Sequence, residues 1–203
     1  LKVYEKWEKL LNANSVAVSV EYLNQKFFEE VGGSVLIINS KVLPNKNLIE
    51  AIQGLEDKEI LTSEGTWLAI RSENGFDREK WKDAKPVVYS GDYSTLENWW
   101  DLYKQNGEEI QNDFVSITEG RKSQPLSASN NLIGSSDRLF IEEGAYLEGC
   151  TLNTDFGCIY IGKNVEVMEG SSIRGGFSVL DESKIKLGTK VYGPTSIGPK
   201  CRI

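Results

Sequence analysis

The chain has 203 residues, of which 39% are hydrophobic, and it carries a net charge of −7 with no histidine at all. This composition is sufficient for one large folded domain or two small ones. The absence of histidine excludes Ser-His-Asp hydrolases and His-ligated metal enzymes within this chain. The scattered basic residues argue against a nucleic-acid-binding surface.

No apolar run approaches membrane-spanning length and no signal-peptide pattern is present, so we expect a cytoplasmic protein without membrane contact. Cys150, Cys158 and Cys201 are odd in number and irregularly spaced. Without a CxxC pair, they predict buried, unpaired thiols and no metal site. Since the chain starts at Leu1 and stops in mid-pattern at Ile203, we expect the natural protein to be longer.

Residues 1–120 alternate between helical and strand spacing, which predicts an α/β domain. A hairpin is expected from residues 59–63 and 66–72, which flank Glu64-Gly65. The apolar run at 34–39 predicts a strand that is covered on both faces. In chain order, the helices are expected over residues 2–12, 21–31 and 47–55, and the strands over residues 16–20, 34–39 and 87–89.

The region that follows predicts one interrupted helix and then a linker. Ser94 and Glu97 have the spacing of a capping box, which predicts the start of an amphipathic helix. Asn106-Gly107 is expected to interrupt this helix, which resumes over residues 108–117. The polar residues 121–138 are rich in serine and predict a linker between two domains.

The last third repeats every six residues. Such a period fits neither a helix nor a lone strand, but it fits a short strand plus a turn, three of which close one triangular coil. We therefore predict an all-β parallel β-helix over residues 139–203 that continues beyond 203, with an outward loop around residues 153–157. The inward residues are expected to be Ile161, Val167, Ile173, Val179, Ile185, Val191, Ile197 and Ile203.

Five stretches of this chain resemble the sugar nucleotidyltransferase and hexapeptide acyltransferase fusions. The most similar type is the bifunctional N-acetylglucosamine-1-phosphate uridylyltransferase and glucosamine-1-phosphate N-acetyltransferase family. The resemblance implies a partial nucleotidyltransferase-like α/β domain followed by a left-handed parallel β-helix of hexapeptide repeats. The stretches are EKWEK at 5–9, SKVLP at 40–44, GRKSQP at 120–125, IYIGKN at 159–164 and VMEGSSIRG at 167–175.

The resemblance implies two reactions in the full-length protein, whereas this segment alone is expected to be inactive. One joins a sugar 1-phosphate to a nucleotide with the help of Mg²⁺, and the other moves an acetyl group from acetyl-CoA to a sugar amine. It also implies a homotrimer formed through the β-helix, with sugar phosphates and nucleotides as partners. Which sugar, base or acyl group is used does not follow from the residues.

Three candidate site residues come from the same resemblance. The family's magnesium-binding strand ends in Gly-Asp, whereas the matching strand here ends at Asn39 and Ser40, which carry no charge for a hard cation. Arg174 resembles an arginine that contacts the sugar phosphate in the family, and a guanidinium suits that role. A solvated corner arginine is an equal alternative. The family's glycine-rich loop and catalytic histidine have no counterpart in this chain.

Other polar and aromatic features have structural interpretations that we favour over functional ones. Arg121 and Lys122 are expected to be solvated in the linker, and Trp99-Trp100 to pack on a sheet or on the β-helix. The adjacent pairs Glu142-Glu143 and Asp181-Glu182 are expected at exposed corners, because adjacent carboxylates do not converge on one point.

Two function hypotheses therefore remain open. The first is a sugar-nucleotide biosynthesis enzyme, and the second is a non-catalytic trimeric sugar-nucleotide binder or scaffold whose nucleotidyltransferase half is degenerate. A third, a hexapeptide zinc hydratase, requires histidine ligands that the chain lacks.

Overall fold

The computed structural model describes residues 1–17, 32–75, 81 and 83–203. The chain divides into two compact units, Leu1–Asn98 and Trp99–Ile203, which are described separately below. The helix predicted over 21–31 lies outside the described residues, as does most of the strand predicted over 16–20. No helix in the described ranges is long and apolar enough to cross a membrane.

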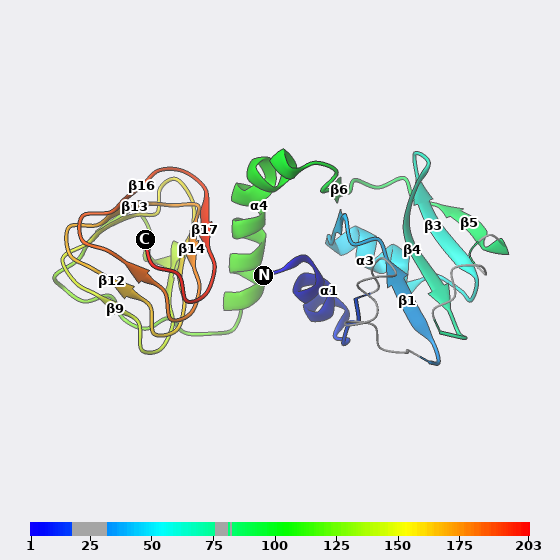
Figure 1. Cartoon of the computed structure of the whole chain (residues 1–203), viewed down its shortest axis with the longest axis horizontal. Helices are drawn as coiled ribbons and strands as arrows, with labels where there is room; N and C mark the ends of the chain where they lie inside the picture. Colours follow the sequence, from blue (N-terminus) through cyan, green and yellow to red (C-terminus); the bar gives the residue numbers. More distant parts are fainter. Residues whose placement is uncertain (18–31, 76–80, 82) are drawn as a thin grey trace. The chain divides into compact units, whose positions relative to one another are not determined.

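The first unit is built on a four-stranded mixed sheet with the order β1-β4-β3-β5 (Figure 1). The predicted hairpin is confirmed, because β3 and β4 pair antiparallel around Glu64-Gly65, and both turn residues have positive φ. The fourth strand, β5, pairs parallel with β3. The strands are β1 (Val35–Ile38), β3 (Glu59–Ser63), β4 (Thr66–Ser72) and β5 (Lys85–Val88).

The strand predicted to be covered on both faces is only partly covered. All four residues of β1 are half-buried, because the strand lies at the end of the described sheet and pairs only with β4. A second, two-stranded sheet follows it, in which β2 (Val42–Leu43) pairs antiparallel with β6 (Ser94–Thr95). Both residues of β2 are buried.

Two helices among the described residues contribute to the core of this unit, and their bounds agree with the predictions within two residues. Helix α1 (Val3–Leu11) buries Trp7, whose indole N–H donates a hydrogen bond of 3.1 Å to the Val42 carbonyl. Leu10, which shares the predicted apolar face, is 43% exposed instead. Helix α3 (Lys46–Gln53) begins at Asn45, whose side chain accepts a hydrogen bond from the Leu48 N–H.

The second unit begins with one continuous helix, α4 (Trp99–Thr118), so the predicted start and interruption are both wrong. Ser94 lies in β6 instead of capping the helix. Gly107 lies inside α4 without breaking it. At this residue the helix packs against Pro194 of the β-helix. A Cβ at Gly107 would lie 2.9 Å from the Pro194 ring. The glycine therefore allows a close approach.

Three parallel sheets form the faces of the predicted β-helix, with α4 packed against β14 and β17 (Figure 1). Ile159 lies opposite Phe177, eighteen residues later, which is three repeats of six per coil. The strands are β7 (Asn131–Ile133), β8 (Leu139–Ile141), β9 (Tyr146–Leu147), β10 (Thr151–Asn153), β11 (Ile159–Ile161), β12 (Glu166–Val167), β13 (Ser172–Arg174), β14 (Phe177–Val179), β15 (Lys184–Ile185), β16 (Lys190–Val191) and β17 (Thr195–Ile197).

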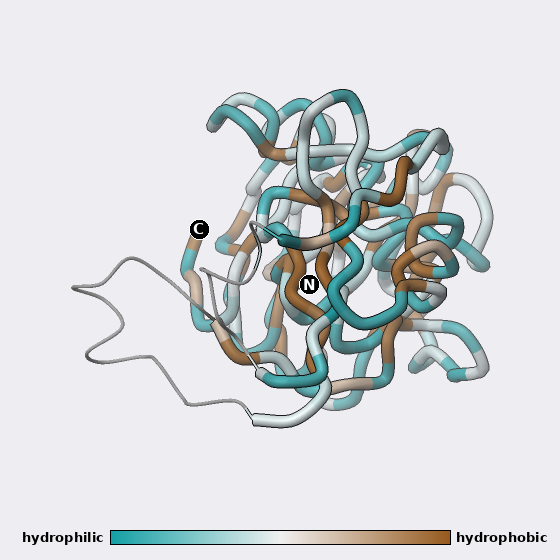
Figure 2. Tube along the Cα trace, turned by 90° about the vertical axis from the view of Figure 1, so that its right-hand side faces the viewer, coloured by the Kyte–Doolittle hydropathy of each residue, from teal (hydrophilic) through white to brown (hydrophobic). Residues whose placement is uncertain are grey.

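The predicted inward ladder is confirmed along its first seven positions. Figure 2 shows short hydrophobic stretches alternating with hydrophilic ones along the chain. The five residues from Ile161 to Ile185 are at most 1% exposed, Val191 is half-buried and Ile197 is 6% exposed. Ile203, on the last coil, is 51% exposed. Burial of each such side chain contributes about 1.5–3 kcal/mol, so this ladder stabilises the unit substantially.

The first coils depart from the six-residue period at one corner. Thr151 lies opposite Ser172, twenty-one residues later, and the additional residues form the predicted loop around 153–157. The β-helix begins at Asn131, within the range that we predicted as a linker. No earlier repeat precedes β7, so periodicity could not reveal it.

Candidate functional site

Both polar atoms of the Asn39 side chain form hydrogen bonds to backbone groups near it. Its Nδ2 donates a hydrogen bond of 3.0 Å to the Trp67 carbonyl, and its Oδ1 accepts one of 3.1 Å from the Lys41 N–H. Asn39 is half-buried at the end of β1, and Ser40 beside it is exposed. Both functional atoms of Asn39 therefore hold the turn after the strand, which is a structural role.

The loop after Asn39 is tied to the end of the first unit by polar contacts. Lys41 Nζ lies 2.6 Å from Glu97 Oε2, and Asn45 Nδ2 donates a hydrogen bond of 2.7 Å to the Asp92 carbonyl. Within the described ranges, no three His, Cys, Asp or Glu side chains gather where they could share a metal ion. The described residues at the end of β1 do not fit a magnesium site.

Arg174 lies at an exposed corner of the β-helix, with its guanidinium stacked on an aromatic ring. The Arg174 Cζ atom is 3.7 Å from the centroid of the Phe156 ring, which belongs to the loop after β10. Phe156 is 62% exposed, and Tyr192, which follows the register partner of Ile173, is 75% exposed. Stacking occupies one face of the guanidinium and leaves its N–H edge in solvent, where it can bind a phosphate or carboxylate.

Glycines fix the position of Arg174 relative to this loop. The Gly175 N–H donates a hydrogen bond of 2.7 Å to the Asn153 carbonyl, and the Gly176 N–H donates one of 3.0 Å to the Cys158 carbonyl. Gly157 has a φ of 145°, which disfavours any side chain. The two coils therefore approach backbone to backbone, which places Phe156 over Arg174.

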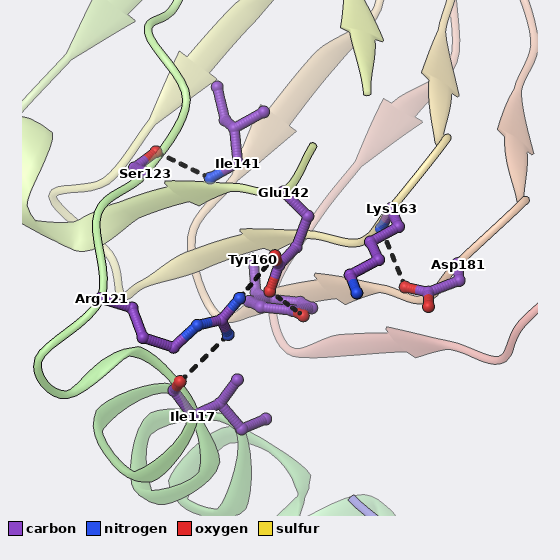
Figure 3. A network of polar contacts seen from close by, with 8 residues as sticks. All are labelled: Ile117, Arg121, Ser123, Ile141, Glu142, Tyr160, Lys163 and Asp181. Carbon is purple, nitrogen blue, oxygen red and sulfur yellow. Dashed lines mark hydrogen bonds and ion pairs between the residues drawn. The ribbon is translucent and has the colours of Figure 1, made fainter. Parts of the chain in front are cut away.

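An ion pair between an exposed arginine and a buried carboxylate, which the sequence did not predict, joins the segment after α4 to the β-helix (Figure 3). Arg121 Nη2 lies 2.7 Å from Glu142 Oε2, and the Glu142 side chain is only 6% exposed. Tyr160 Oη donates a hydrogen bond of 2.8 Å to Glu142 Oε1, and Arg121 Nη1 donates one to the Ile117 carbonyl. Arg121 also lies over the Phe140 ring, at 5.0 Å.

This network corrects our prediction for Glu142 and refines the one for Arg121. Arg121 is exposed as predicted but is paired with a carboxylate, and Glu142 is buried rather than at an exposed corner, although Glu143 is exposed as predicted. Arg121 and Glu142 are twenty-one residues apart, and they pair because α4 packs against the β-helix. Local sequence patterns do not predict this packing. Lys122 is exposed as predicted.

The electrostatics of the network favour an ionised Glu142. Burial by itself would raise the pKa of Glu142, but hydrogen bonds from Arg121 and Tyr160, with the positive charges of Arg121 and Lys163, hold it below its usual value. The pKa of Tyr160 is raised by burial and by its hydrogen bond to Glu142. Each polar group is already paired within the network, which indicates a structural role.

We expect Arg121→Ala to lower the free energy of unfolding by about 2 kcal/mol at pH 7, since it leaves a buried carboxylate without its cation. Because the pKa of Glu142 is lower in the folded state than in the unfolded state, the ionised carboxylate stabilises the fold at pH values above its unfolded-state pKa. This contribution is lost as the pH falls through its folded-state pKa. The deficit of the variant should therefore shrink towards pH 4. Urea unfolding at both pH values measures this, with exposed Lys122→Ala as the control; equal deficits at both would contradict it.

Several other predictions are settled by the structure. Asp181 and Glu182 are exposed, as predicted, and Asp181 Oδ1 accepts a hydrogen bond from the Lys163 N–H (Figure 3). Trp99 and Trp100 are 85% and 56% exposed, contrary to the predicted packing. The three cysteines are unpaired as predicted; Cys150 and Cys158 are buried and Cys201 is half-buried.

The first 122 residues match a family model described as sugar nucleotidyl transferase. This match covers more than half of the chain and includes Asn39, Ser40 and Arg121. No curated protein matches the chain. The β-helix that follows has the fold typical of hexapeptide acyltransferases.

Proposed function

Because the chain belongs to the sugar nucleotidyl transferase family, we propose that the protein acts in sugar-nucleotide biosynthesis of the UDP-N-acetylglucosamine type. The observation that carries this proposal is the family match over residues 1–122 in one chain with a hexapeptide-type β-helix. The paired arrangement supports a protein that handles a sugar phosphate and its nucleotide, and we propose Mg²⁺ and acetyl-CoA as its cofactors.

Arg174 is the residue that we propose for recognition of the sugar phosphate. Its guanidinium is held against Phe156, and it forms no hydrogen bond or ion pair with any residue that the structure describes. A positioned guanidinium with a free N–H edge can bind two phosphate oxygens at once. We also propose that the β-helix assembles as a homotrimer in the cytoplasm, which light scattering tests through the mass of the particle in solution.

A second candidate function is a non-catalytic sugar-nucleotide binder or scaffold. The hydrogen bonds of Asn39 favour it, because both functional atoms of that side chain hold the backbone at Trp67 and Lys41. The residue that takes the place of the family's metal-binding aspartate thus serves the fold. No step of the nucleotidyl transfer is assigned to it.

Calorimetry and turnover together separate the two candidates. UDP-N-acetylglucosamine is titrated into the protein, pyrophosphate release is followed with sugar 1-phosphate, UTP and Mg²⁺, and acetyl transfer is followed with acetyl-CoA. Binding with turnover supports the enzyme, and binding without turnover supports the scaffold. If no UDP-sugar binds and neither reaction proceeds, both candidates are wrong.

Arg174→Ala tests the proposed phosphate contact directly. We expect the variant to bind sugar 1-phosphate about tenfold more weakly, since a hydrogen bond to a charged group contributes about 1.5–3 kcal/mol. Arg202→Ala, which removes another exposed arginine of the β-helix, is the matched control and should leave the affinity unchanged. Equal affinities in the two variants would remove Arg174 from the site.

A further inference from the structure

A cavity of about 310 Å³, open to solvent on one side, lies at the first coil of the β-helix, where the segment between α4 and β7 crosses β8 and β9. This volume is at the lower end of the range for small-molecule sites. Its walls combine an apolar surface with one aromatic ring and one carboxylate. The residues that define it are Pro125, Leu126, Ile141, Leu147, Tyr146 and Glu148.

The carboxylate of Glu148 is held in place through one of its two oxygens. The hydroxyls of Ser127 and Ser129 both donate hydrogen bonds to Glu148 Oε2, the first at 2.8 Å. Glu148 Oε1 forms no hydrogen bond with any described residue. The same serine hydroxyls, Ser129 before Ser127, lower the pKa of Glu148, so the group stays anionic.

The charge of the cavity wall selects for a cation. Among the described residues that line it, none is a lysine or an arginine, so an anionic ligand would meet Glu148 without any compensating charge. Tyr146 also lines the cavity and is 57% exposed, and the face of a tyrosine ring attracts cations. Leu126, which packs against the core, and Ile141 supply apolar surface beside these two groups.

We propose that this cavity binds a small organic amine, whose ammonium group pairs with Glu148 Oε1 while its apolar body lies against Tyr146 and the aliphatic wall. A carboxylate and an aromatic ring beside aliphatic side chains form the combination that recognises ammonium ligands. This site is separate from the sugar-nucleotide function proposed above, because the described residues that line it include no lysine or arginine to balance the charge of a phosphate.

Three ligands that share one ring test the proposal: cyclohexylamine, cyclohexanol and cyclohexanecarboxylate, each titrated into the full chain and followed by NMR. We expect the amine to bind with millimolar or better affinity, the alcohol to bind more weakly and the carboxylate not to bind. Failure of the amine to bind, or equal binding of all three ligands, would overturn the proposal. A titration of the same samples with UDP-N-acetylglucosamine shows whether the sugar-nucleotide function fails independently.

Glu148→Gln keeps the shape of the side chain and removes its charge. We expect it to weaken amine binding about tenfold, while alcohol binding stays unchanged. Glu143→Gln, which neutralises an exposed carboxylate on the same coil but outside the cavity, should have no effect. Tyr146→Leu removes the ring face and decides the question if Glu148→Gln does not fold. Unchanged amine affinity in a folded Glu148→Gln or Tyr146→Leu variant would also overturn the proposal.

Discussion

Gly175→Ala is expected to lower the free energy of unfolding of the β-helix by about 3 kcal/mol or more. A Cβ at this position would lie 1.9 Å from the Gly157 carbonyl oxygen and 2.6 Å from its carbon. Both atoms belong to the backbone of the neighbouring coil, so no rotation of a side chain can relieve the overlap. The coils would have to separate, and the hydrogen bond from the Gly175 N–H to the Asn153 carbonyl would lengthen.

Gly198→Ala is the matched control within the same β-helix. A Cβ at Gly198 would meet only the Cys201 sulfur, at 3.9 Å, and Gly198 does not have the left-handed conformation that strains an alanine. We expect a change within about 0.5 kcal/mol, or a small gain in stability from the stiffer unfolded chain. Urea unfolding followed by circular dichroism measures both variants. Equal stability of the two would show that the coils at Gly157 and Gly175 are not in close backbone contact.

The β-helix could be predicted from the sequence because one contact pattern recurs at a fixed interval. An inward residue at each sixth position meets the equivalent residue of the next coil, so Ile161 and Val179 are neighbours by register and by period alike. The residue type at each inward position therefore indicates its buried surroundings. One atypical residue does not hide the pattern, because the other repeats still show it. The prediction failed at β7, where no repeat precedes the strand, and at Ile203, where no described coil follows.

The site residues could not be predicted in the same way, because a residue type does not reveal its partners. The position of Asn39 at the end of a strand makes it a candidate binding residue, but its side-chain amide forms hydrogen bonds that hold the turn. The sequence predicts that Arg121 and Glu142 are solvent-exposed, but the two pair with each other because α4 packs against the β-helix. Gly107 was interpreted as a break in the helix, although it is a contact with Pro194. In each case the deciding neighbour is distant in the sequence.

Phe177→Ala is expected to lower the free energy of unfolding by about 3–5 kcal/mol, the usual range when a buried aromatic side chain is truncated. Phe177 is fully buried in the core cluster of the β-helix and lies in the register between Ile159 and Thr195. The equivalent position of the other repeats holds a smaller residue, such as Val165 or Ser183. The ring therefore fills space that the smaller side chains of the neighbouring coils cannot fill, and its removal leaves a cavity.

Two further variants separate this cavity from a general sensitivity of the repeat. Phe177→Leu retains most of the buried volume and should cost less than about 1.5 kcal/mol, whereas Leu187→Ala, at a residue that is 68% exposed, should change stability by less than about 0.5 kcal/mol. Chemical unfolding of the three variants gives the ranking. A cost below about 1 kcal/mol for Phe177→Ala would contradict a close-packed prism, and the corner that places Arg174 beside Phe156 would then lack the rigid support that phosphate recognition requires.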